Sequence, residues 1–285
     1  MYASPNALAP HYSKFKVGER LLLTGHSHQA WPDVARDAQL AAWDDAAAHV
    51  DDKWSAAFAK AERVRRGFAR LLDEPGATIA LAASTHDLLV RWLSALPLRA
   101  RPRIVTTDGE FHSARRQLDR LAEEGIEVVK VAALPAATVA ERLAGRLDDR
   151  TAAVVVSAVF YENAHIVPHL RDLLTACRRH DVELLIDAYH ALNVVPFSVE
   201  AQRLHDAFVI GGGYKYCQLG EGNCFLRLPP DCAMRPVITG WFAEFDRLEQ
   251  AAAGRVAYGP GAPRFAGSTY DPTSHYRAAA VFGFF

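Results

Sequence analysis

Three side chains capable of covalent or proton chemistry lie at or just after the ends of two apolar runs. Asp187 is the last residue of the run at 183–187 (ELLID), and His190 follows three residues later. Lys215 lies just beyond the run at 207–211 (AFVIG), within the glycine-rich segment GGGYKY. A lysine amine can form a Schiff base with a carbonyl group, and a carboxylate can pair with a protonated ring nitrogen. These residue types are therefore suited to holding a reactive aromatic cofactor.

Two further strand ends carry groups that suit a phosphate and an aromatic ring. Ser84 and Thr85 end the first predicted strand and open a helix, whose amide groups and dipole favour an anion. Phe111 and Ser113 follow the second predicted strand. A lysine, a carboxylate, a phosphate cradle and an aromatic face are together what pyridoxal 5'-phosphate requires. The combination predicts a site for this cofactor.

Each of these residues also has a purely structural interpretation. Asp187 could cap the next element, and Lys215 could be a solvated loop lysine. Phe111 could belong to the core. Ser84 could be an ordinary N-cap, with Asp87 completing a capping box. Only their joint occurrence favours cofactor binding.

Several other catalytic signatures are absent from the sequence. It contains no GxxxxGK[ST] phosphate loop, no GxGxxG after the first strand and no HExxH. The segment at 25–29 (GHSHQ) differs from a GxSxG nucleophile elbow at its last residue. His26 and His28 in that segment could bind a metal, but no third ligand is evident nearby, which favours polar loop residues. The sequence therefore predicts no metal site.

Predicted strands and helices alternate along most of the chain. Apolar runs occur at 78–82, 103–107, 127–131, 153–157, 183–187 and 207–211, and helical patterns at 86–96, 113–124, 138–147 and 170–180. Nearly continuous apolar strands separated by helices indicate βαβ units and an α/β fold, with a mainly parallel sheet covered on both faces. Ligands bind at the carboxyl ends of the strands in such sheets. The functional site is therefore expected at that edge.

The segments on either side of the α/β region differ from it. Residues 1–40 are expected to form an N-terminal segment and 41–255 the main domain. Apolar residues three and four apart before residue 72 predict one long helix or two consecutive ones, with Trp43 and Trp54 as core anchors.

The last part of the sequence, 256–285, is expected to begin a shortened C-terminal region. Its helix, predicted from 276 to 285 with Ser274 as a possible N-cap, ends on three phenylalanines. Such an apolar end is expected to need a partner surface.

The composition excludes several classes of protein. Of the 285 residues, 50% are hydrophobic and 23% charged, and the net charge is −1. This chain can build a large core, and it has no overall attraction to nucleic acid or to anionic membranes. Its apolar runs are too short to span a bilayer, its first five residues lack signal-peptide features, and its four cysteines show no CxxC spacing. We expect a cytoplasmic protein without nucleic-acid or membrane partners.

Taken in order, seven short motifs resemble those of class V, fold-type-I pyridoxal-phosphate enzymes, and most closely the kynureninases. They are GHSHQAWP (25–32) for GNSLGxxP, GEFHS (109–113) for FPS/FPT, SAVFY (157–161) for SHVNY, DAYH (187–190) for DxxH, GYKY (213–216) for YKY, GWF (240–242) for GW(F/W) and FAGST (265–269) for FxxGT. DxxH followed by GYKY is the most specific combination. The resemblance implies the large domain of that fold type, with the small C-terminal domain largely missing.

The resemblance assigns roles to individual residues. Lys215 would hold the cofactor and accept a proton from an amino-acid substrate, while Asp187 would pair with the ring nitrogen. His190 would orient that carboxylate or line the ring, and Phe111 would stack on the ring. The remaining cofactor contacts implied are Ser84, Thr85, Ser113, Tyr214, Trp241 and, from a neighbouring subunit, Thr269. His28, Trp31 and Tyr161 are the candidates for the substrate side. The resemblance also implies a homodimer with its sites at the subunit interface.

The implied reaction is hydrolytic Cβ–Cγ cleavage of kynurenine or 3-hydroxykynurenine to alanine and an anthranilate. The sequence departs from the kynureninase pattern at 221–223, where EGN replaces GPG, and at His26, Ala114, Ala158 and Phe160. Three alternatives stay open. They are another class V reaction such as amino transfer or C–S cleavage, a cofactor-binding homologue without activity, and a metal-dependent hydrolase built on His26, His28, Asp187 and His190.

Overall fold

The computed structural model describes residues 7–250 and 254–285. Residues 1–6, on which the expectation of no signal peptide rests, lie outside the described residues. One sheet contains seven strands in the order β1-β7-β6-β5-β4-β2-β3. The strands are β1 (Thr78–Ala82), β2 (Arg103–Thr107), β3 (Glu127–Val131), β4 (Thr151–Ser157), β5 (Glu183–Asp187), β6 (Phe208–Gly212) and β7 (Cys224–Leu228). Strands β2 to β6 are parallel, whereas β7 lies antiparallel between β1 and β6. This mixed sheet confirms the predicted α/β fold class.

The sheet separates two hydrophobic cores. Along β4, Val154 and Val156 face one core and Ala153 and Val155 the other, because successive side chains of a strand point to opposite faces. The first core is completed by α2 (Lys53–Leu71), α5 (Val139–Ala144), α6 (Leu170–Arg179) and α8 (Thr273–Phe284), and the second by α3 (Thr85–Ala95) and α4 (His112–Glu123). Coverage of both faces explains why the strands read as continuous apolar runs.

All six predicted strands and the four predicted helices between them are present, with bounds that differ by a few residues. Strand β7 was not predicted. It runs antiparallel to β6 and follows the 11-residue connection that carries Lys215. The sequence therefore has no helical pattern between β6 and β7 that would indicate a further strand. The other short elements are η1 (Ala9–Phe15), η3 (Ala136–Thr138), α7 (Val199–Gln202), η4 (Trp241–Gln250) and η5 (Ala262–Phe265). None of the described helices is long and apolar enough to cross a membrane.

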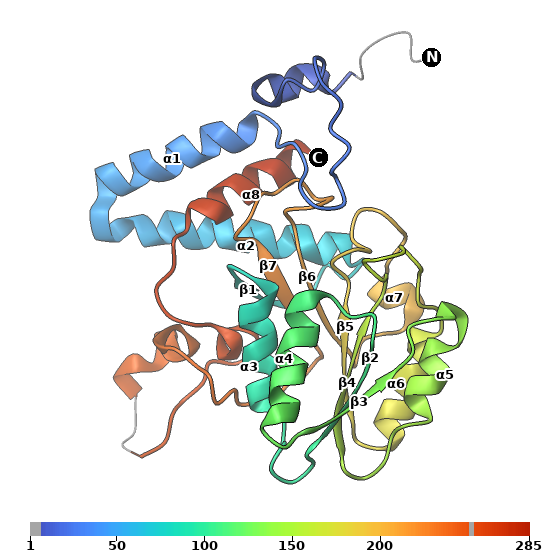
Figure 1. The fold of residues 1–285 in the computed structure, drawn as a ribbon. Coiled ribbons are helices and arrows are strands. Elements are labelled where there is room, and N and C mark those ends of the chain that lie inside the picture. Colours follow the sequence, from blue (N-terminus) through green and yellow to red (C-terminus); the bar gives the residue numbers. More distant parts are fainter. Residues whose placement is uncertain (1–6, 251–253) are drawn as a thin grey trace.

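The predicted N-terminal helical stretch is two helices, α1 (Val34–His49) and α2, joined by η2 (Val50–Asp52). Helix α8 packs against both of them (Figure 1). Ala42 of α1 packs with Tyr276 of α8, whereas Trp43 is 77% exposed. The prediction of Trp43 as a core anchor is therefore wrong, because small residues form the face of α1 that α8 approaches. Trp54 is partly buried among the rings of Phe58, Phe242 and Tyr270.

The apolar end of the chain packs largely on the chain itself. The Phe282 ring lies 5.3 Å from that of Phe68, and the Phe284 ring lies 5.1 Å from that of His11. Only Phe285, at 60% exposure, keeps a large free surface. The expectation that all three terminal phenylalanines need a partner surface is therefore wrong for two of them.

The start of α8 also differs from the prediction. The Ser274 hydroxyl donates to the carbonyl oxygen of Gly222 at 3.1 Å and does not cap the helix. The carboxylate of Asp271 accepts the Thr273 N–H at 2.9 Å instead. Ser274 therefore ties the helix to the loop before β7.

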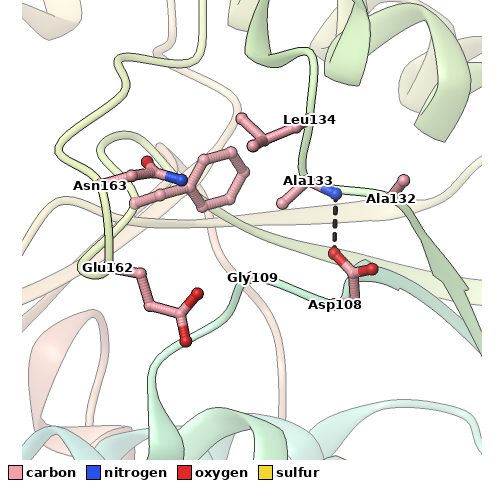
Figure 2. A pocket seen from close by; sticks show the side chains of 8 residues that line it. Asp108, Gly109, Ala132, Ala133, Leu134, Glu162 and Asn163 are labelled. Atoms are coloured by element: carbon pink, nitrogen blue, oxygen red, sulfur yellow. Dashed lines mark hydrogen bonds between the residues drawn. The ribbon is translucent and has the colours of Figure 1, made fainter.

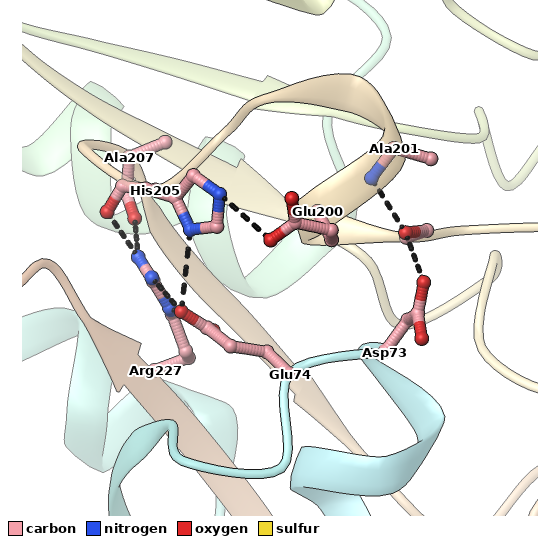
Figure 3. A network of polar contacts seen from close by, with 8 residues as sticks. Asp73, Glu74, Glu200, Ala201, His205, Ala207 and Arg227 are labelled. Carbon is pink, nitrogen blue, oxygen red and sulfur yellow. Dashed lines mark hydrogen bonds and ion pairs between the residues drawn. The ribbon is translucent and has the colours of Figure 1, made fainter.

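A buried ion pair lies at the amino end of β6 (Figure 3). The guanidinium of Arg227 in β7 is 1% exposed, pairs with the carboxylate of Glu74 and donates to the carbonyl oxygens of His205 and Ala207 at 2.6 and 2.8 Å. A buried charge is tolerated when it is paired and its donors are satisfied in this way. His205 and Ala207 directly precede β6, whereas Lys215 follows it. The network therefore lies at the opposite end of this strand from Lys215.

Candidate functional site

A cavity of about 270 Å³ lies at the carboxyl ends of the strands. This volume is just below the usual range for drug-sized ligands, so the cavity suits a small ligand. Its lining comes from the segment after β1, the segment after β2, the segment after β5 and the connection from β6 to β7. The lining residues are Ala83, Ser84, Thr85, His86, Phe111, Ser113, Asp187, Tyr189, His190, Tyr214, Lys215, Glu221, Gly222 and Cys224. The structure thus brings eight of the predicted cofactor-side residues into one cavity.

Lys215 is held at the centre of this group. Its side chain is buried, and its Nζ lies 2.7 Å from Nε2 of His190 and 5.0 Å from the centre of the Phe111 ring. Burial lowers the pKa of Lys215, and the negative charge of Asp187 opposes this effect. A lysine in such surroundings can lose its proton more readily than a solvated one, as a nucleophilic amine must.

His190 is the hydrogen-bond acceptor of this contact. Burial, followed by the charges of Lys215 and His26, lowers the pKa of His190 to about 4. The imidazole is therefore neutral near pH 7. When Lys215 is protonated, its N–H donates a hydrogen bond to Nε2 of the neutral ring, whose own proton is then on Nδ1. The contact orients the lysine without adding a second charge.

Asp187 is a buried carboxyl at the end of β5. Its Oδ1 accepts the backbone N–H of Tyr189 at 2.8 Å. Burial raises the pKa of Asp187 to about 6, although this hydrogen bond and the charge of Lys215 act in the opposite direction. A cation placed against it would favour the ionised form. The site therefore offers a carboxylate that is suited to a protonated ring nitrogen.

The first turn of α3 faces the other end of the cavity. Ser84 is the N-cap of this helix, and its Oγ accepts the Asp87 N–H at 3.1 Å, which confirms the capping interpretation. The helix has 11 residues and its leading amides carry the positive end of the dipole. Ala83, Ser84, Thr85 and His86 line the cavity here, so this end suits a phosphate.

Glu110 is a buried group that the sequence interpretation did not single out. Its carboxylate accepts hydrogen bonds from the Thr107 hydroxyl at 2.6 Å, the Ser157 N–H at 3.2 Å and the Ser157 hydroxyl at 2.6 Å. Burial raises the pKa of Glu110 to about 7, and the charge of Asp187 adds to this. Its position directly before Phe111 was the available signal. Glu110 joins the ends of β2 and β4 through Thr107 and Ser157.

The predicted substrate-side residues lie around the cavity rather than in its lining. The His28 ring lies 5.1 Å from that of Tyr214, and its Nε2 is 3.4 Å from Oε1 of Glu221. The Tyr161 ring meets that of Phe111 edge-on at 5.3 Å. The guanidinium of Arg277 lies 4.6 Å from the centre of the Trp31 ring, so Trp31 supports the loop that α8 contacts.

Trp241 and Thr269 are placed apart from the other predicted phosphate ligands. The Trp241 ring stacks on Phe242 at 4.3 Å and is 41% exposed, and Thr269 is also exposed. Within the part of the chain that the structure describes, neither residue lines the cavity. Their proposed contact with phosphate stays a prediction that requires a neighbouring subunit.

A second cavity, of about 390 Å³, lies beyond the ends of β2 and β3 (Figure 2). The Asp108 and Glu162 carboxylates and the apolar side chains of Leu134 and Phe160 line it, and Asp108 accepts the Ala133 N–H at 2.7 Å. It contains neither a lysine nor a histidine. Although it is larger, this cavity has no lysine that could form a Schiff base, so the cavity around Lys215 is the candidate site.

The metal-site alternative finds no support in the geometry. Among residues 7–250 and 254–285, no three histidine, cysteine, aspartate or glutamate side chains are placed to hold a metal ion. His26, His28, Asp187 and His190 therefore do not form a ligand set.

Comparisons with known proteins give matches in structure only. The sequence matches no protein-family model and no curated protein. Among solved structures, the cystine C–S lyase C-DES in complex with its product cysteine persulfide is 20% identical, with a TM-score of 0.75 over 91% of this chain and 70% of that chain. A C-DES variant with glycine covalently linked to the pyridoxal-phosphate cofactor is 18% identical, with a TM-score of 0.79 over 99% and 74%.

The apo cysteine desulfurase from Thermococcus onnurineus NA1 is a further match. It is 16% identical, with a TM-score of 0.76 over 98% of this chain and 70% of that chain. At these identities the likeness concerns the backbone. The chain has the α/β fold of the cystine C–S lyase and cysteine desulfurase structures over more than nine-tenths of its length.

Proposed function

We propose that this chain binds pyridoxal 5'-phosphate through Lys215 and cleaves a carbon–sulfur bond of an amino acid. The observation that carries the proposal is the buried Lys215 amine, 2.7 Å from a neutral His190 and in the same cavity as Asp187 and the α3 N-terminus. Each chemical part of the cofactor has a matching group in this cavity.

The residues fit the cofactor in charge as well as in type. When bound, pyridoxal phosphate supplies an aldehyde that condenses with amines and a ring that stabilises negative charge at the substrate Cα. Asp187 would hold the ring nitrogen in its protonated form. Phe111 would fix the plane of the ring by stacking. Lys215, once released from the cofactor, would take the Cα proton at Nζ, since burial lowers its pKa.

C–S cleavage is favoured over hydrolysis of a C–C bond for two reasons. The solved structures with this fold include a cystine C–S lyase and a cysteine desulfurase. In addition, Ala158 and Phe160 replace polar residues of the kynureninase pattern, and both are buried, at 3% and 1% exposure. These two positions therefore offer the substrate no polar side chain.

Kynureninase-like hydrolysis is the second candidate. The motifs DAYH and GYKY are the part of the sequence that most resembles kynureninases, and the fold places His190 of the first against Lys215 of the second. The two candidates share their cofactor residues and differ in the substrate's side chain.

The first experiment measures cofactor attachment. The purified protein with pyridoxal phosphate should absorb visible light, and borohydride should fix a label that mass spectrometry maps to Lys215. The Lys215→Ala variant should lose the label, whereas Lys130→Ala, which alters a lysine paired with Asp119 outside the cavity, should keep it. An unlabelled wild-type protein would refute the proposal.

The second experiment identifies the reaction. Protein loaded with pyridoxal phosphate, without borohydride treatment, is incubated with cystine, cysteine, kynurenine and 3-hydroxykynurenine. Release of sulfide or persulfide supports the C–S lyase, and an anthranilate product supports the second candidate. A keto acid formed with an amino-group acceptor would indicate an aminotransferase instead. Absence of every product from the loaded, unreduced protein would indicate a homologue that only binds the cofactor.

The homodimer is also a proposal. Trp241 and Thr269 are exposed, which is compatible with contact by a second subunit. Light scattering with and without the cofactor tests the proposal. A monomer at micromolar concentration would contradict it.

A further inference from the structure

Tyr189 has a buried hydroxyl whose proton has no oxygen or nitrogen acceptor among the described residues. The residue is 8% exposed, and its OH atom has no partner in full hydrogen-bonding geometry; the Tyr214 backbone N–H, a donor, and the Cys224 thiol are the groups that interact with it. Yet Tyr189 lines the cavity of Lys215. Buried hydroxyls without a partner are rare in folded proteins, so one that borders a binding cavity points to a ligand atom as its partner.

The surroundings of the ring show that this placement is built into the fold. A Cβ at position 212 would lie 2.6 Å from Cε2 and 2.7 Å from Cζ of Tyr189. The backbone of Gly212 is not in the left-handed region, so its conformation does not require glycine. Glycine at 212 therefore provides the space that the Tyr189 ring occupies, and a Cβ there would displace the ring.

The hydroxyl end of Tyr189 lies toward the start of α3. The Cys224 sulfur, 2.7 Å from the same Cβ position at 212, interacts with both the Tyr189 side chain and the backbone N–H of Thr85. A thiol is a weak acceptor and does not satisfy a phenol. Burial raises the pKa of Tyr189 above its ordinary value, so the hydroxyl keeps its proton and acts as a donor.

The first turn of α3 borders this end of the cavity and contains both its leading backbone amides and the side chain of Asp87. The leading amides of α3 donate toward an anion, and the phenol adds a further donor next to Thr85. We propose that the Tyr189 hydroxyl donates a hydrogen bond to a phosphate oxygen of the ligand held at the N-terminus of α3. The inference rests on the proposed cofactor for its ligand, and it assigns a specific anion-binding role to a residue outside the sequence predictions.

The test measures the binding of two ligands, pyridoxal phosphate and unphosphorylated pyridoxal, to the wild-type protein and to two variants. Tyr189→Phe removes the hydroxyl and keeps the ring. Tyr258→Phe is the matched control, because the Tyr258 hydroxyl donates to the Pro236 carbonyl oxygen outside the cavity. Dissociation constants for pyridoxal phosphate and for unphosphorylated pyridoxal are measured by absorbance titration, and far-UV circular dichroism checks that each variant folds.

We expect Tyr189→Phe to weaken binding of pyridoxal phosphate about tenfold or more, as for a lost hydrogen bond to a charged group, and to leave pyridoxal binding unchanged. Tyr258→Phe should change neither. Equal loss for both ligands, or no loss for either, would overturn the assignment.

A separate probe distinguishes this inference from the proposed function. Inorganic phosphate should raise the melting temperature of the wild-type protein more than that of Tyr189→Phe. If the wild type fails to bind pyridoxal phosphate but shows this difference, the cofactor proposal fails and the anion assignment stands. If inorganic phosphate stabilises both proteins equally, the assignment is overturned.

Discussion

The buried carboxyl of Glu110 makes the stability of the cofactor-free protein depend on pH. Glu110 ordinarily titrates at 4.5, and burial raises its pKa to about 7 in the folded state. The folded protein therefore binds this proton more tightly than the unfolded chain. By linkage, the stabilising effect is fully present below pH 4.5, falls as the pH rises toward 7 and is lost above it.

The size of the effect follows from the two pKa values. A tenfold change in proton affinity is about 1.4 kcal/mol, so the displacement from 4.5 to about 7 corresponds to about 3 kcal/mol. Glu110→Gln removes the titration. The amide oxygen can accept the Ser157 N–H and the Thr107 hydroxyl, and the amide nitrogen can donate to the Ser157 hydroxyl. The variant should exceed the free energy of unfolding of the wild type by about 1 kcal/mol at pH 5 and by about 3 kcal/mol at pH 8.

The assay is urea unfolding of the cofactor-free proteins between pH 5 and 8, followed by tryptophan fluorescence. Asp187, whose pKa is also raised, titrates in both proteins, so its own contribution largely cancels in the difference. Glu162→Gln is the control, because Glu162 is exposed. It measures how a glutamate-to-glutamine change alters the free energy of unfolding when the carboxyl group is not buried. A difference between wild type and Glu110→Gln that is the same at every pH would refute the reasoning.

Three other substitutions test separate parts of the structure. Ser84→Ala removes the side-chain cap of α3 and should lower the free energy of unfolding by about 1 kcal/mol, measured by urea titration; an unchanged midpoint would contradict the capping role. Gly212→Ala forces a Cβ against the Tyr189 ring and should destabilise the fold by about 1–3 kcal/mol, measured by thermal unfolding; full tolerance would show that the ring can move aside. Glu74→Ala leaves the Arg227 guanidinium buried without its partner and should lower the free energy of unfolding by about 3–5 kcal/mol, measured with guanidinium chloride. A loss under 1 kcal/mol would mean that water reaches Arg227.

The sequence was sufficient to predict the strands and helices that have a local hydrophobic pattern. Apolar runs and helical periodicity predicted six strands and the helices between them, since both faces of the sheet are covered. Because parallel strands end at one edge, Lys215, Asp187, Phe111 and Ser84 were expected there, and they line one cavity.

The remaining features depend on contacts that no local pattern encodes. The exposure of Trp43 follows from the close approach of α8, which begins at residue 273. The Glu110 carboxylate accepts a hydrogen bond from Ser157, which is 47 residues away in the sequence. The Tyr189 ring occupies the space left by the missing side chain of Gly212. These pairings arise only when the sheet is assembled.

The position of β7 has a consequence for synthesis of the chain. Strand β1 is at an edge of the sheet, and its one neighbour in the sheet is β7, which leaves the ribosome about 140 residues later. Until then, β1 presents unpaired backbone groups that can recruit another chain. The buried ion pair between Glu74 and Arg227 likewise joins residues separated by 153 positions. Formation of the complete sheet must therefore wait until residue 228 has been made, and nascent chains that stop before β7 are those in which strand pairing between molecules is most favoured.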